Sequence, residues 1–332
     1  MAVSQHRSIA GLDPAMFRRL LLGWFAQFQR KLPWRGATDP YHILVSEIML
    51  QQTRVSVVED RYVRFIAQFP SLERLARAKE ATVLAAWSGL GYYRRARALH
   101  RTAKEIVRRG SFPSAATELM ELPGLGRYTA AAVASIAFGE PVAVVDGNVK
   151  RVLDRVVNQK ATSPESNAEK QYWEIAGQLL DRQSPGDFNQ AMMELGALVC
   201  LPAQPMCHAC PVANMCGARG PTEKAERPAR RKAELHYALA RRNGSVLLRQ
   251  RNKQSSLMPG MWELPEIEAA GKHSKLPFLK LRHSITTTDY TVSVHVGKKR
   301  KSQGDRWVPL RSIHRLPLTG LTRKIIRGLG DA

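Results

Sequence analysis

The hydrophobic pattern of this chain changes its period about two-thirds of the way along. Between residues 12 and 200, apolar side chains recur three and four positions apart, and segments of strand character are almost absent. Three later segments, residues 236–241, 245–250 and 290–296, have strand character, and the last alternates Val with polar residues. The sequence therefore predicts a multidomain fold, an all-α domain followed by a small α+β domain.

A polar segment with prolines, glycines and many basic residues separates the two patterns, which is typical of a linker. At 332 residues the chain is also too long for one ordinary hydrophobic core. We therefore expect an all-α domain over residues 1–220, a linker over 221–233 and a second domain over 234–332.

Local signals give approximate bounds for the helices. Pro14 opens the first helix, Ser71 can cap a short one, and Thr82 can cap another that ends at Gly89-Leu90-Gly91. The remaining predicted helices cover residues 42–54, 57–69, 92–109, 115–121, 127–138, 149–156, 169–180, 188–199 and 321–328.

Positive charge dominates the composition. The chain has 51 Lys and Arg against 28 Asp and Glu, a formal net charge of +23, which indicates a polyanionic partner such as nucleic acid. Residues 221–332 are the more basic part, with 24 Lys and Arg against nine Asp and Glu. No apolar run is long enough to span a membrane and no secretory signal is visible, so we expect a cytoplasmic protein without a membrane partner.

The four cysteines are bunched within 17 residues, as Cys200-x6-Cys207-x2-Cys210-x5-Cys216. They are too few and too close together for a secreted disulfide framework, but four thiolates can converge on one metal centre. Spacing alone leaves zinc and an iron–sulfur cluster equally open. Four free buried thiols are the simpler alternative, which the Pro-rich turns of the segment disfavour.

Two glycine-containing turns have features of DNA contacts. In Leu122-Pro123-Gly124-Leu125-Gly126-Arg127, Gly124 and Gly126 can expose backbone amides at a helix N-terminus, where a phosphate binds; an ordinary connection with a Gly C-cap is the alternative. Tyr92 and Tyr93 follow Gly89-Leu90-Gly91 and precede three arginines. Such aromatics can enter a base stack, or can simply be core residues beside a solvated basic face.

Two carboxylates have unusual settings. Glu47 lies within an apolar run, where burial would raise its pKa and suit a general acid. A place on the wet face of its helix, or a pair with Arg54, is the alternative. Asp146 directly precedes a predicted helix and could be an ordinary N-cap or a carboxylate facing a developing cation.

Taken together and in this order, these motifs resemble the endonuclease III superfamily of helix–hairpin–helix DNA glycosylases, and within it the adenine glycosylases. The motifs that carry the resemblance are Leu32-Pro33-Trp34-Arg35, Ser46-Glu47-Ile48-Met49-Leu50-Gln51-Gln52-Thr53, Gly89-Leu90-Gly91-Tyr92-Tyr93, Leu122-Pro123-Gly124-Leu125-Gly126-Arg127-Tyr128-Thr129-Ala130, Val145-Asp146-Gly147-Asn148-Val149-Lys150-Arg151 and the cysteine array.

The resemblance implies two helical subdomains with the active site in the cleft between them. Residues 31–138 would form a six-helix barrel, and residues 1–30 and 139–220 an iron–sulfur subdomain. The implied cofactor is a [4Fe–4S] cluster on the four cysteines, Cys200, Cys207, Cys210 and Cys216.

The family's catalytic residues match four positions. Glu47 matches the acid that protonates the flipped-out base and later activates water, and Asp146 matches the aspartate that stabilises the sugar cation. Tyr128 and Asn148 match residues that support the sugar and the aspartate. Endonuclease III-type lyases carry a Schiff-base-forming Lys where this chain has Tyr128, so the resemblance implies a monofunctional glycosylase.

Further positions match the family's DNA contacts. Arg35 and Gln190 match residues that hold the adenine, and Gln52 and Tyr92 match residues that fill the DNA stack after flipping. Gly124 and Gly126 belong to the matching hairpin.

The second domain resembles the C-terminal domain of adenine glycosylases. Residues 257–265 resemble a Nudix-fold segment, but the paired glutamates that bind metal in Nudix hydrolases are absent. The resemblance implies a domain that recognises 8-oxoguanine without hydrolysing it. Ser284 matches the family's Phe-Ser-His contact, with His283 and Ile285 in place of Phe and His; a loop serine is the alternative.

The resemblance therefore predicts a monomeric base-excision-repair enzyme that removes adenine from A:8-oxoguanine or A:G mispairs in double-stranded DNA. One alternative is an endonuclease III-like glycosylase and lyase for oxidised pyrimidines. The other is a non-catalytic iron–sulfur DNA-binding protein that only uses the scaffold.

Overall fold

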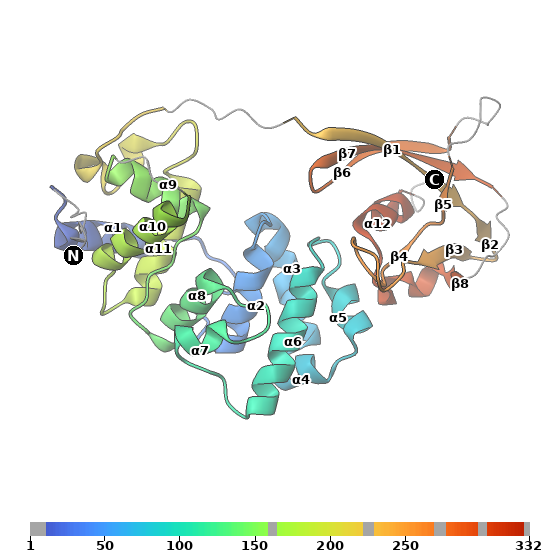
Figure 1. The fold of residues 1–332 in the computed structure, drawn as a ribbon, viewed down its shortest axis with the longest axis horizontal. Coiled ribbons are helices and arrows are strands. Elements are labelled where there is room, and N and C mark those ends of the chain that lie inside the picture. Colours follow the sequence, from blue (N-terminus) through green and yellow to red (C-terminus); the bar gives the residue numbers. More distant parts are fainter. Residues whose placement is uncertain (1–10, 159–164, 222–228, 269–276, 298–303, 329–332) are drawn as a thin grey trace. The chain divides into compact units, whose positions relative to one another are not determined.

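The computed structural model describes residues 11–158, 165–221, 229–268, 277–297 and 304–328, and the chain divides into two units (Figure 1). Unit 1 comprises Met1–Ile66, Ser71–Ala76 and Arg101–Ala225; unit 2 comprises Ala67–Pro70, Arg77–His100 and Glu226–Ala332. The structure thus groups residues 77–100, which we expected to lie in the helical barrel, with the C-terminal strands.

The first 221 residues contain only α-helices and 3-10 turns in the part that the structure describes, which confirms the all-α prediction. The elements are α1 Pro14–Phe28, α2 Pro40–Leu50, α3 Val55–Gln68, α4 Leu72–Arg77, α5 Glu80–Ala86, α6 Arg94–Arg109, α7 Ala116–Met120, α8 Arg127–Phe138, α9 Gly147–Val156, α10 Glu165–Leu179, α11 Pro185–Leu198, η1 Cys207–Ala209 and η2 Ala213–Met215. In the described residues, no helix combines the length and apolar character that crossing a bilayer requires.

Capping residues set several of these bounds. Asp13 accepts hydrogen bonds from the first turn of α1, with Pro14 as the first helical residue, and Ser71 accepts one from Arg74 in α4. The prediction that Thr82 caps α5 is wrong, because α5 begins at Glu80 with Lys79 as its N-cap. No side chain caps this helix start, and the Thr82 amide instead donates to the Lys79 carbonyl at 2.9 Å.

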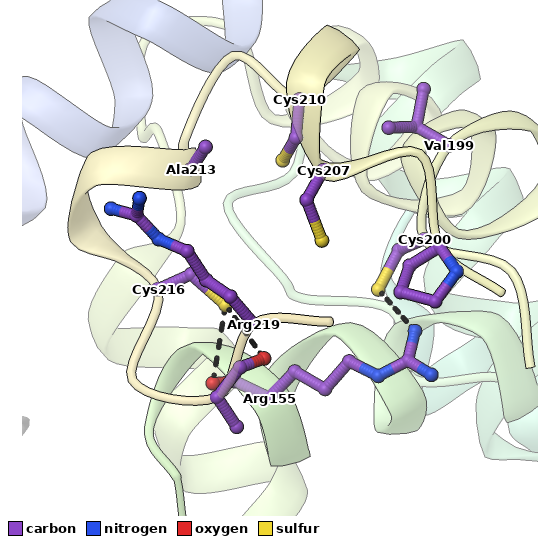
Figure 2. A pocket seen from close by; sticks show the side chains of 10 residues that line it. Arg155, Val199, Cys200, Cys207, Cys210, Ala213, Cys216 and Arg219 are labelled. Atoms are coloured by element: carbon purple, nitrogen blue, oxygen red, sulfur yellow. Dashed lines mark hydrogen bonds between the residues drawn. The ribbon is translucent and has the colours of Figure 1, made fainter. Parts of the chain in front are cut away.

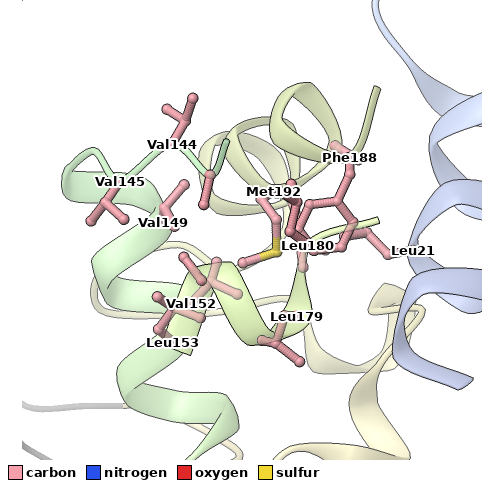
Figure 3. Close-up of a cluster of buried hydrophobic side chains, with 14 of the residues drawn as sticks. Leu21, Val144, Val145, Val149, Val152, Leu153, Leu179, Leu180, Phe188 and Met192 are labelled. Atoms are coloured by element: carbon pink, nitrogen blue, oxygen red, sulfur yellow. The ribbon is translucent and has the colours of Figure 1, made fainter. Parts of the chain in front are cut away.

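A buried apolar cluster joins α1, α8, α9, α10 and α11 in unit 1 (Figure 3). Leu21, Leu153 and Phe188 are almost completely buried in it, and each such side chain contributes about 2 kcal/mol. Helix α8 also packs on α2. The cluster therefore fixes α8, α9 and α11, which carry most of the candidate site.

In its described residues, unit 2 contains two four-stranded sheets. One has the order β5-β1-β7-β6, with β1 and β7 parallel and β6 antiparallel to β7; the other joins β2, β3 and β4, with β8 paired to β3. The elements are β1 Arg231–Leu239, β2 Arg241–Arg242, β3 Ser245–Gln250, β4 Trp262–Glu263, β5 Glu266–Ile267, β6 Leu279–Ile285, β7 Thr288–Val296, β8 Asp305–Pro309, η3 Leu310–Arg315 and α12 Gly320–Arg327.

The apolar faces of these strands and α12 share one core. Val292 and Val294 of β7 share this core with Leu321 and Ile325 of α12, so the strand predicted for residues 290–296 is confirmed, but the alternation fails at its end, where Val296 is exposed. The predicted strand over 245–250 matches β3, and the predicted helix over 321–328 matches α12 to one residue. Strand β1 begins at Arg231, so the last three residues expected in the linker belong to the sheet.

Candidate active site

Glu47 lies inside α2, a helix whose side chains are almost all buried. It is 6% exposed, and its Oε2 accepts a 2.9 Å hydrogen bond from the Tyr128 hydroxyl on α8. The alternative that Glu47 lies on the wet face of the helix is therefore wrong. Burial raises the pKa of Glu47 to about 7; the Tyr128 hydrogen bond opposes this increase, and the negative charge of Asp146 adds to it.

Asp146 is the N-cap of α9, as the simpler interpretation predicted. Its Oδ1 accepts a 2.7 Å hydrogen bond from the Val149 amide, and its Oδ2 accepts a 3.1 Å bond from the side-chain amide of Asn148. The charge of Asp146 also raises the pKa values of Glu47 and Tyr128. The carboxylate of Asp146 is therefore close enough to affect Glu47 and Tyr128. Asp146 is both the N-cap of α9 and a residue of the candidate site.

Tyr128 lies in the first turn of α8, and the charges of both Glu47 and Asp146 act on its hydroxyl. Its hydroxyl donates to Glu47, and its oxygen also lies 3.2 Å from Sδ of Met193 on α11. Burial, and then the charges of Glu47 and Asp146, raise the pKa of Tyr128 well above its usual value. The hydroxyl therefore keeps its proton and remains a donor toward Glu47.

Arg151 on α9 orients the amide of Asn148. Its Nη2 donates to Oδ1 of Asn148 at 2.8 Å and to the Gly196 carbonyl at 2.7 Å, which leaves the Asn148 amide nitrogen facing Asp146. Its Nε donates to the Cys200 carbonyl at 2.7 Å. A Cβ on Gly196 would lie 2.6 Å from Cβ of Asn148, so this packing requires glycine. Arg151 stands at the end of a motif identified from the sequence, but no local pattern predicted this role for Arg151 or for Gly196.

Arg35 and Gln190 meet through a hydrogen bond from Nη1 of Arg35 to Oε1 of Gln190. Glu194, one turn after Gln190 on α11, accepts 2.9 Å bonds from Nη2 of Arg35 and from the Arg30 guanidinium. Burial opposes ionisation of Glu194, but the hydrogen bonds and charges of Arg30 and the charge of Arg35 outweigh it and lower its pKa. Sequence reasoning missed Glu194, although it is an acid in an apolar run like Glu47.

One donor in this group is unused. Nε of Arg35 is buried and has no hydrogen-bond partner among the described residues. Burial lowers the pKa of Arg35, against the charge of Glu194, and the guanidinium lies 5.0 Å from the ring centroid of Phe25. A buried unpaired N–H is rare and costly, which marks this position as a place for an acceptor supplied by a ligand.

All four cysteines line one pocket, and Figure 2 shows their sulfurs around a common space. Arg155 of α9 donates to Sγ of Cys200 at 3.1 Å. Burial raises the pKa of Cys210 to about 11 and also raises that of Cys216. Within the described residues, no three His, Cys, Asp or Glu side chains are grouped closely enough to hold a single metal ion.

Gln52 and Tyr92 share an unusual backbone. Their φ angles are 54° and 44°, in the left-handed region that non-glycine residues rarely adopt, and Tyr92 is 43% exposed.

Gly124 in the α7–α8 turn has a φ of 84°, and Gly126 is the N-cap of α8, with no side chain capping the helix. The C-cap of α7 is Glu121, so the alternative of a Gly C-cap there is wrong.

Ser284 lies in β6 and not in a loop, so the alternative of a loop serine is wrong. It is exposed, and its hydroxyl donates a 2.6 Å hydrogen bond to Asp289, which also accepts from Arg230 at 2.8 Å. The cross-strand register places Ser284 directly opposite Asp289. This serine belongs to unit 2, whereas Glu47 belongs to unit 1.

The family model described as HhH-GPD superfamily base excision DNA repair protein matches residues 45–178. The chain is similar to the adenine DNA glycosylase of Rattus norvegicus, with 36% identity over 86% of this chain and 67% of the rat protein. It is also similar to that of Homo sapiens, with 46% identity over 63% of this chain and 40% of the human protein. The adenine DNA glycosylase of Buchnera aphidicola (strain Sg) is 34% identical over 72% of this chain and 69% of the relative.

Two solved structures share the fold. A thermostable thymine-DNA glycosylase superposes with a TM-score of 0.56 and 30% identity, over 61% of this chain and 94% of that chain. A trapped endonuclease III–DNA covalent intermediate superposes with a TM-score of 0.51 over 62% of this chain and 96% of that chain. At 23% identity, the second likeness shows the fold alone.

Proposed function

Because the chain belongs to the adenine DNA glycosylase family of base-excision-repair enzymes, we propose that it hydrolyses the N-glycosidic bond of adenine flipped out of duplex DNA. The observation that carries the proposal is the state of Glu47. A buried carboxyl with a pKa of about 7, hydrogen-bonded to Tyr128 and close to the charge of Asp146, has the properties of a general acid at neutral pH.

Glu47 would act first, on the leaving base. Its proton passes to a ring nitrogen of adenine, which makes the base a neutral leaving group as the bond to C1′ breaks. The resulting carboxylate can then take a proton from water, whose oxygen forms the new bond to C1′. The pKa near 7 suits both roles, because the group can give and regain a proton at little cost.

Asp146 would face the positive charge that develops on the sugar. Its two oxygens are held by the Val149 amide and by Asn148, so little reorganisation is needed as the charge forms. One protonated and one ionised carboxyl is the division of labour used in glycoside cleavage.

The base would occupy the surroundings of Arg35 and Gln190. Since Arg35 binds the oxygen of the Gln190 amide, the NH2 of that amide remains available to a ring nitrogen of the base. The unused Nε of Arg35 supplies a second buried donor. Glu194 holds Arg35 in place through Nη2 of its guanidinium.

DNA contacts would come from both units. The uncapped N-terminus of α8, reached through Gly124 and Gly126, suits a phosphate, and Gln52 and Tyr92 would fill the gap in the stack. Unit 2 supplies the larger positive charge, and its Ser284 is an exposed hydroxyl suited to contact the opposite base. We propose double-stranded DNA with A:8-oxoguanine or A:G mispairs as the substrate of a cytoplasmic monomer.

The cysteine pocket fits a [4Fe–4S] cluster better than zinc. One zinc ion would need four sulfurs about 2.3 Å from a single point, whereas the thiols here surround a wider space. In a cluster each cysteine binds a different iron, which suits that spacing. The group would supply a rigid anchor for the loop that Arg151 and Arg155 hold. Iron and sulfide analysis of the purified protein distinguishes the two.

The experiment is incubation of Glu47→Gln with duplexes that differ only in the base opposite adenine. We expect base release to fall at least about 10³-fold while duplex binding remains, because Gln lacks the proton that the leaving base needs. The matched control is Glu174→Gln, an exposed glutamate on α10, which should retain the wild-type rate.

The same duplexes test the two alternatives. Tyr128 has no amine for a Schiff base, so strands should break only after alkali or heat. Strand cleavage without alkali and release of oxidised pyrimidines would instead support the endonuclease III-like enzyme. An absence of base release from every duplex would support the non-catalytic DNA-binding protein.

A further inference from the structure

The loop Ser88–Tyr93, between α5 and α6 in unit 2, has a strained backbone. Gly89, Gly91 and Tyr92 have φ angles of 102°, 69° and 44°, so three of four consecutive residues are left-handed. For Tyr92 this conformation is unfavourable and persists only where surrounding contacts impose it. The position of the Tyr92 ring therefore depends on whatever holds this loop.

Some of those contacts come from the loop's own neighbourhood. The Trp87 indole donates to the Gly91 carbonyl at 3.1 Å, and Arg95 donates to the Leu90 carbonyl at 3.1 Å. The Arg95 guanidinium also lies 5.4 Å from the ring centroid of Tyr92. These contacts fix the middle of the loop and leave the ends to be held by other residues.

The ends are held by residues from the C-terminal part of the same unit. The buried hydroxyl of Tyr93 donates to the Leu318 carbonyl at 3.0 Å, and Nη1 of Arg323 donates to the Ser88 carbonyl at 2.8 Å. Next to the loop, Nη2 of Arg97 donates to the Pro259 carbonyl at 2.6 Å. Every acceptor is a backbone carbonyl, so these three bonds fix the backbone of one segment relative to a side chain of the other.

The C-terminal side of this contact is stiff. The Trp262 amide of β4 donates to the Pro317 carbonyl at 2.8 Å, and the Thr319 amide donates back to the Trp262 carbonyl at 2.9 Å. Oγ1 of Thr322, which is buried, accepts from the Leu264 amide at 3.1 Å. Residues 317–323, the docking segment, are thereby tied to β4 and to the unit 2 core, and can act as a fixed support.

We propose that the docking segment positions Tyr92, and that Arg323 and Tyr93 are positioning residues through which the C-terminal strands control the entry of Tyr92 into the DNA stack. The inference rests on the proposed function, since Tyr92 fills the stack only if duplex DNA is the substrate. Under this proposal, recognition of the opposite base and insertion of Tyr92 both depend on the position of the docking segment. Arg323 and Tyr93 touch neither the adenine nor the carboxylates in this scheme.

The first test compares two substitutions on α12 that remove the same charge. Arg323→Met removes the bond to Ser88, whereas Arg327→Met removes an exposed arginine one turn further along. We expect Arg323→Met to lower the single-turnover rate on adenine opposite 8-oxoguanine about tenfold, and Arg327→Met to change it less than about twofold. Arg323→Lys, which keeps a donor, should recover most of the rate.

A double-mutant cycle shows whether Arg323 acts through Tyr92. In the Tyr92→Ala background, Arg323→Met should have no further effect, because the ring that it positions is already absent. The proposal would be overturned if Arg323→Met lowered the rate by the same factor in the wild-type and Tyr92→Ala proteins. A general loss of stability would have that result.

A fluorescent base separates this proposal from the proposed function. With 2-aminopurine beside the mispair in an uncleavable duplex, insertion of Tyr92 should raise the fluorescence; Arg323→Met should lower it to the level of Tyr92→Ala, and Arg327→Met should not. A wild-type signal from Arg323→Met would overturn the docking role even if adenine is released. If the fluorescence of the variants follows the expected order but no adenine is released, the docking role is supported and the proposed function is wrong.

Discussion

Glu47 and Glu194 are both buried acids on helices of unit 1, yet their surroundings give them opposite properties. Glu47 is 6% exposed and has a pKa of about 7, whereas Glu194 is 3% exposed and has a lowered pKa. Burial favours the neutral form of both. The difference lies in the partners. Glu47 bonds a neutral hydroxyl and faces the negative charge of Asp146, with only a smaller opposing effect from the charge of Arg35, whereas Glu194 bonds two guanidinium groups.

This comparison separates an acid that can act in the reaction from one that only holds its neighbours. The proton of Glu47 is available near neutral pH, because ionisation there leaves a buried charge close to Asp146. Glu194 is ionised throughout that range and orients Arg30 and Arg35. Burial alone therefore does not identify a catalytic acid; the charge of the groups that face it does.

Among the changes to the groups that surround the two acids, the largest effect on rate is expected from Asp146→Asn, which removes the negative charge near Glu47. We expect the rate of base release to fall about 10³-fold, because the sugar cation loses its carboxylate. The pKa of Glu47 should also fall, since the charge of Asp146 raises it. A single-turnover rate profile against pH measures both effects.

Asp13→Asn is the matched control, because Asp13 caps α1 as Asp146 caps α9. An asparagine can accept the same capping bonds, so both variants should fold. A rate loss of similar size in the two variants would show that capping, and not charge, explains the effect.

Stability should change in opposite directions in Glu47→Gln and Glu194→Gln. The raised pKa of Glu47 means that the folded state binds its proton more tightly than the unfolded state, so stability falls as pH rises from about 4.5 to about 7. Glu47→Gln removes this loss and should stabilise the protein by up to about 3 kcal/mol above pH 7.

Glu194→Gln should destabilise the protein by about 2–3 kcal/mol at neutral pH, because it leaves Arg35 buried without its counter-charge. The depressed pKa of Glu194 gives stability that is present above the unfolded value and lost as pH falls through the folded value. The difference from wild type should therefore shrink in acid. Urea unfolding at several pH values measures both variants, and equal shifts of the same sign would contradict the comparison.

The sequence could identify Glu47 but not the contrast with Glu194. An acid in an apolar run is visible in both cases, and only the fold shows that Arg30 and Arg35 come from a segment about 160 residues away from Glu194. Asp146 was also ambiguous from sequence, because a helix N-cap and a site carboxylate have the same local pattern. Partners distant in sequence decide the chemistry of each group.

The fold shows a similar limit. The segment Arg127–Phe138 was predicted to the residue, because Gly126 precedes its first residue and Gly139, in the left-handed conformation, ends it. The two-residue strands β4 and β5 exist only through their pairing with neighbouring strands, so no local pattern could give them. Strand β6 lies at a sheet edge with only Leu279 and Leu281 turned to the core, which makes its alternation too weak to stand out.

The smallest expected effect comes from Tyr128→Phe, which removes the only neutral donor described for Glu47. The Tyr128 hydrogen bond lowers the pKa of Glu47, so its loss should raise that pKa above about 7. The alkaline limb of the rate profile should then move to higher pH, while the plateau falls about threefold to tenfold because Glu47 is held less firmly. The matched control is Tyr172→Phe, which removes a hydroxyl bonded to Asp154 and should leave the limb in place. A limb that stays in place or moves to lower pH in Tyr128→Phe would mean that a group other than Glu47 supplies the proton.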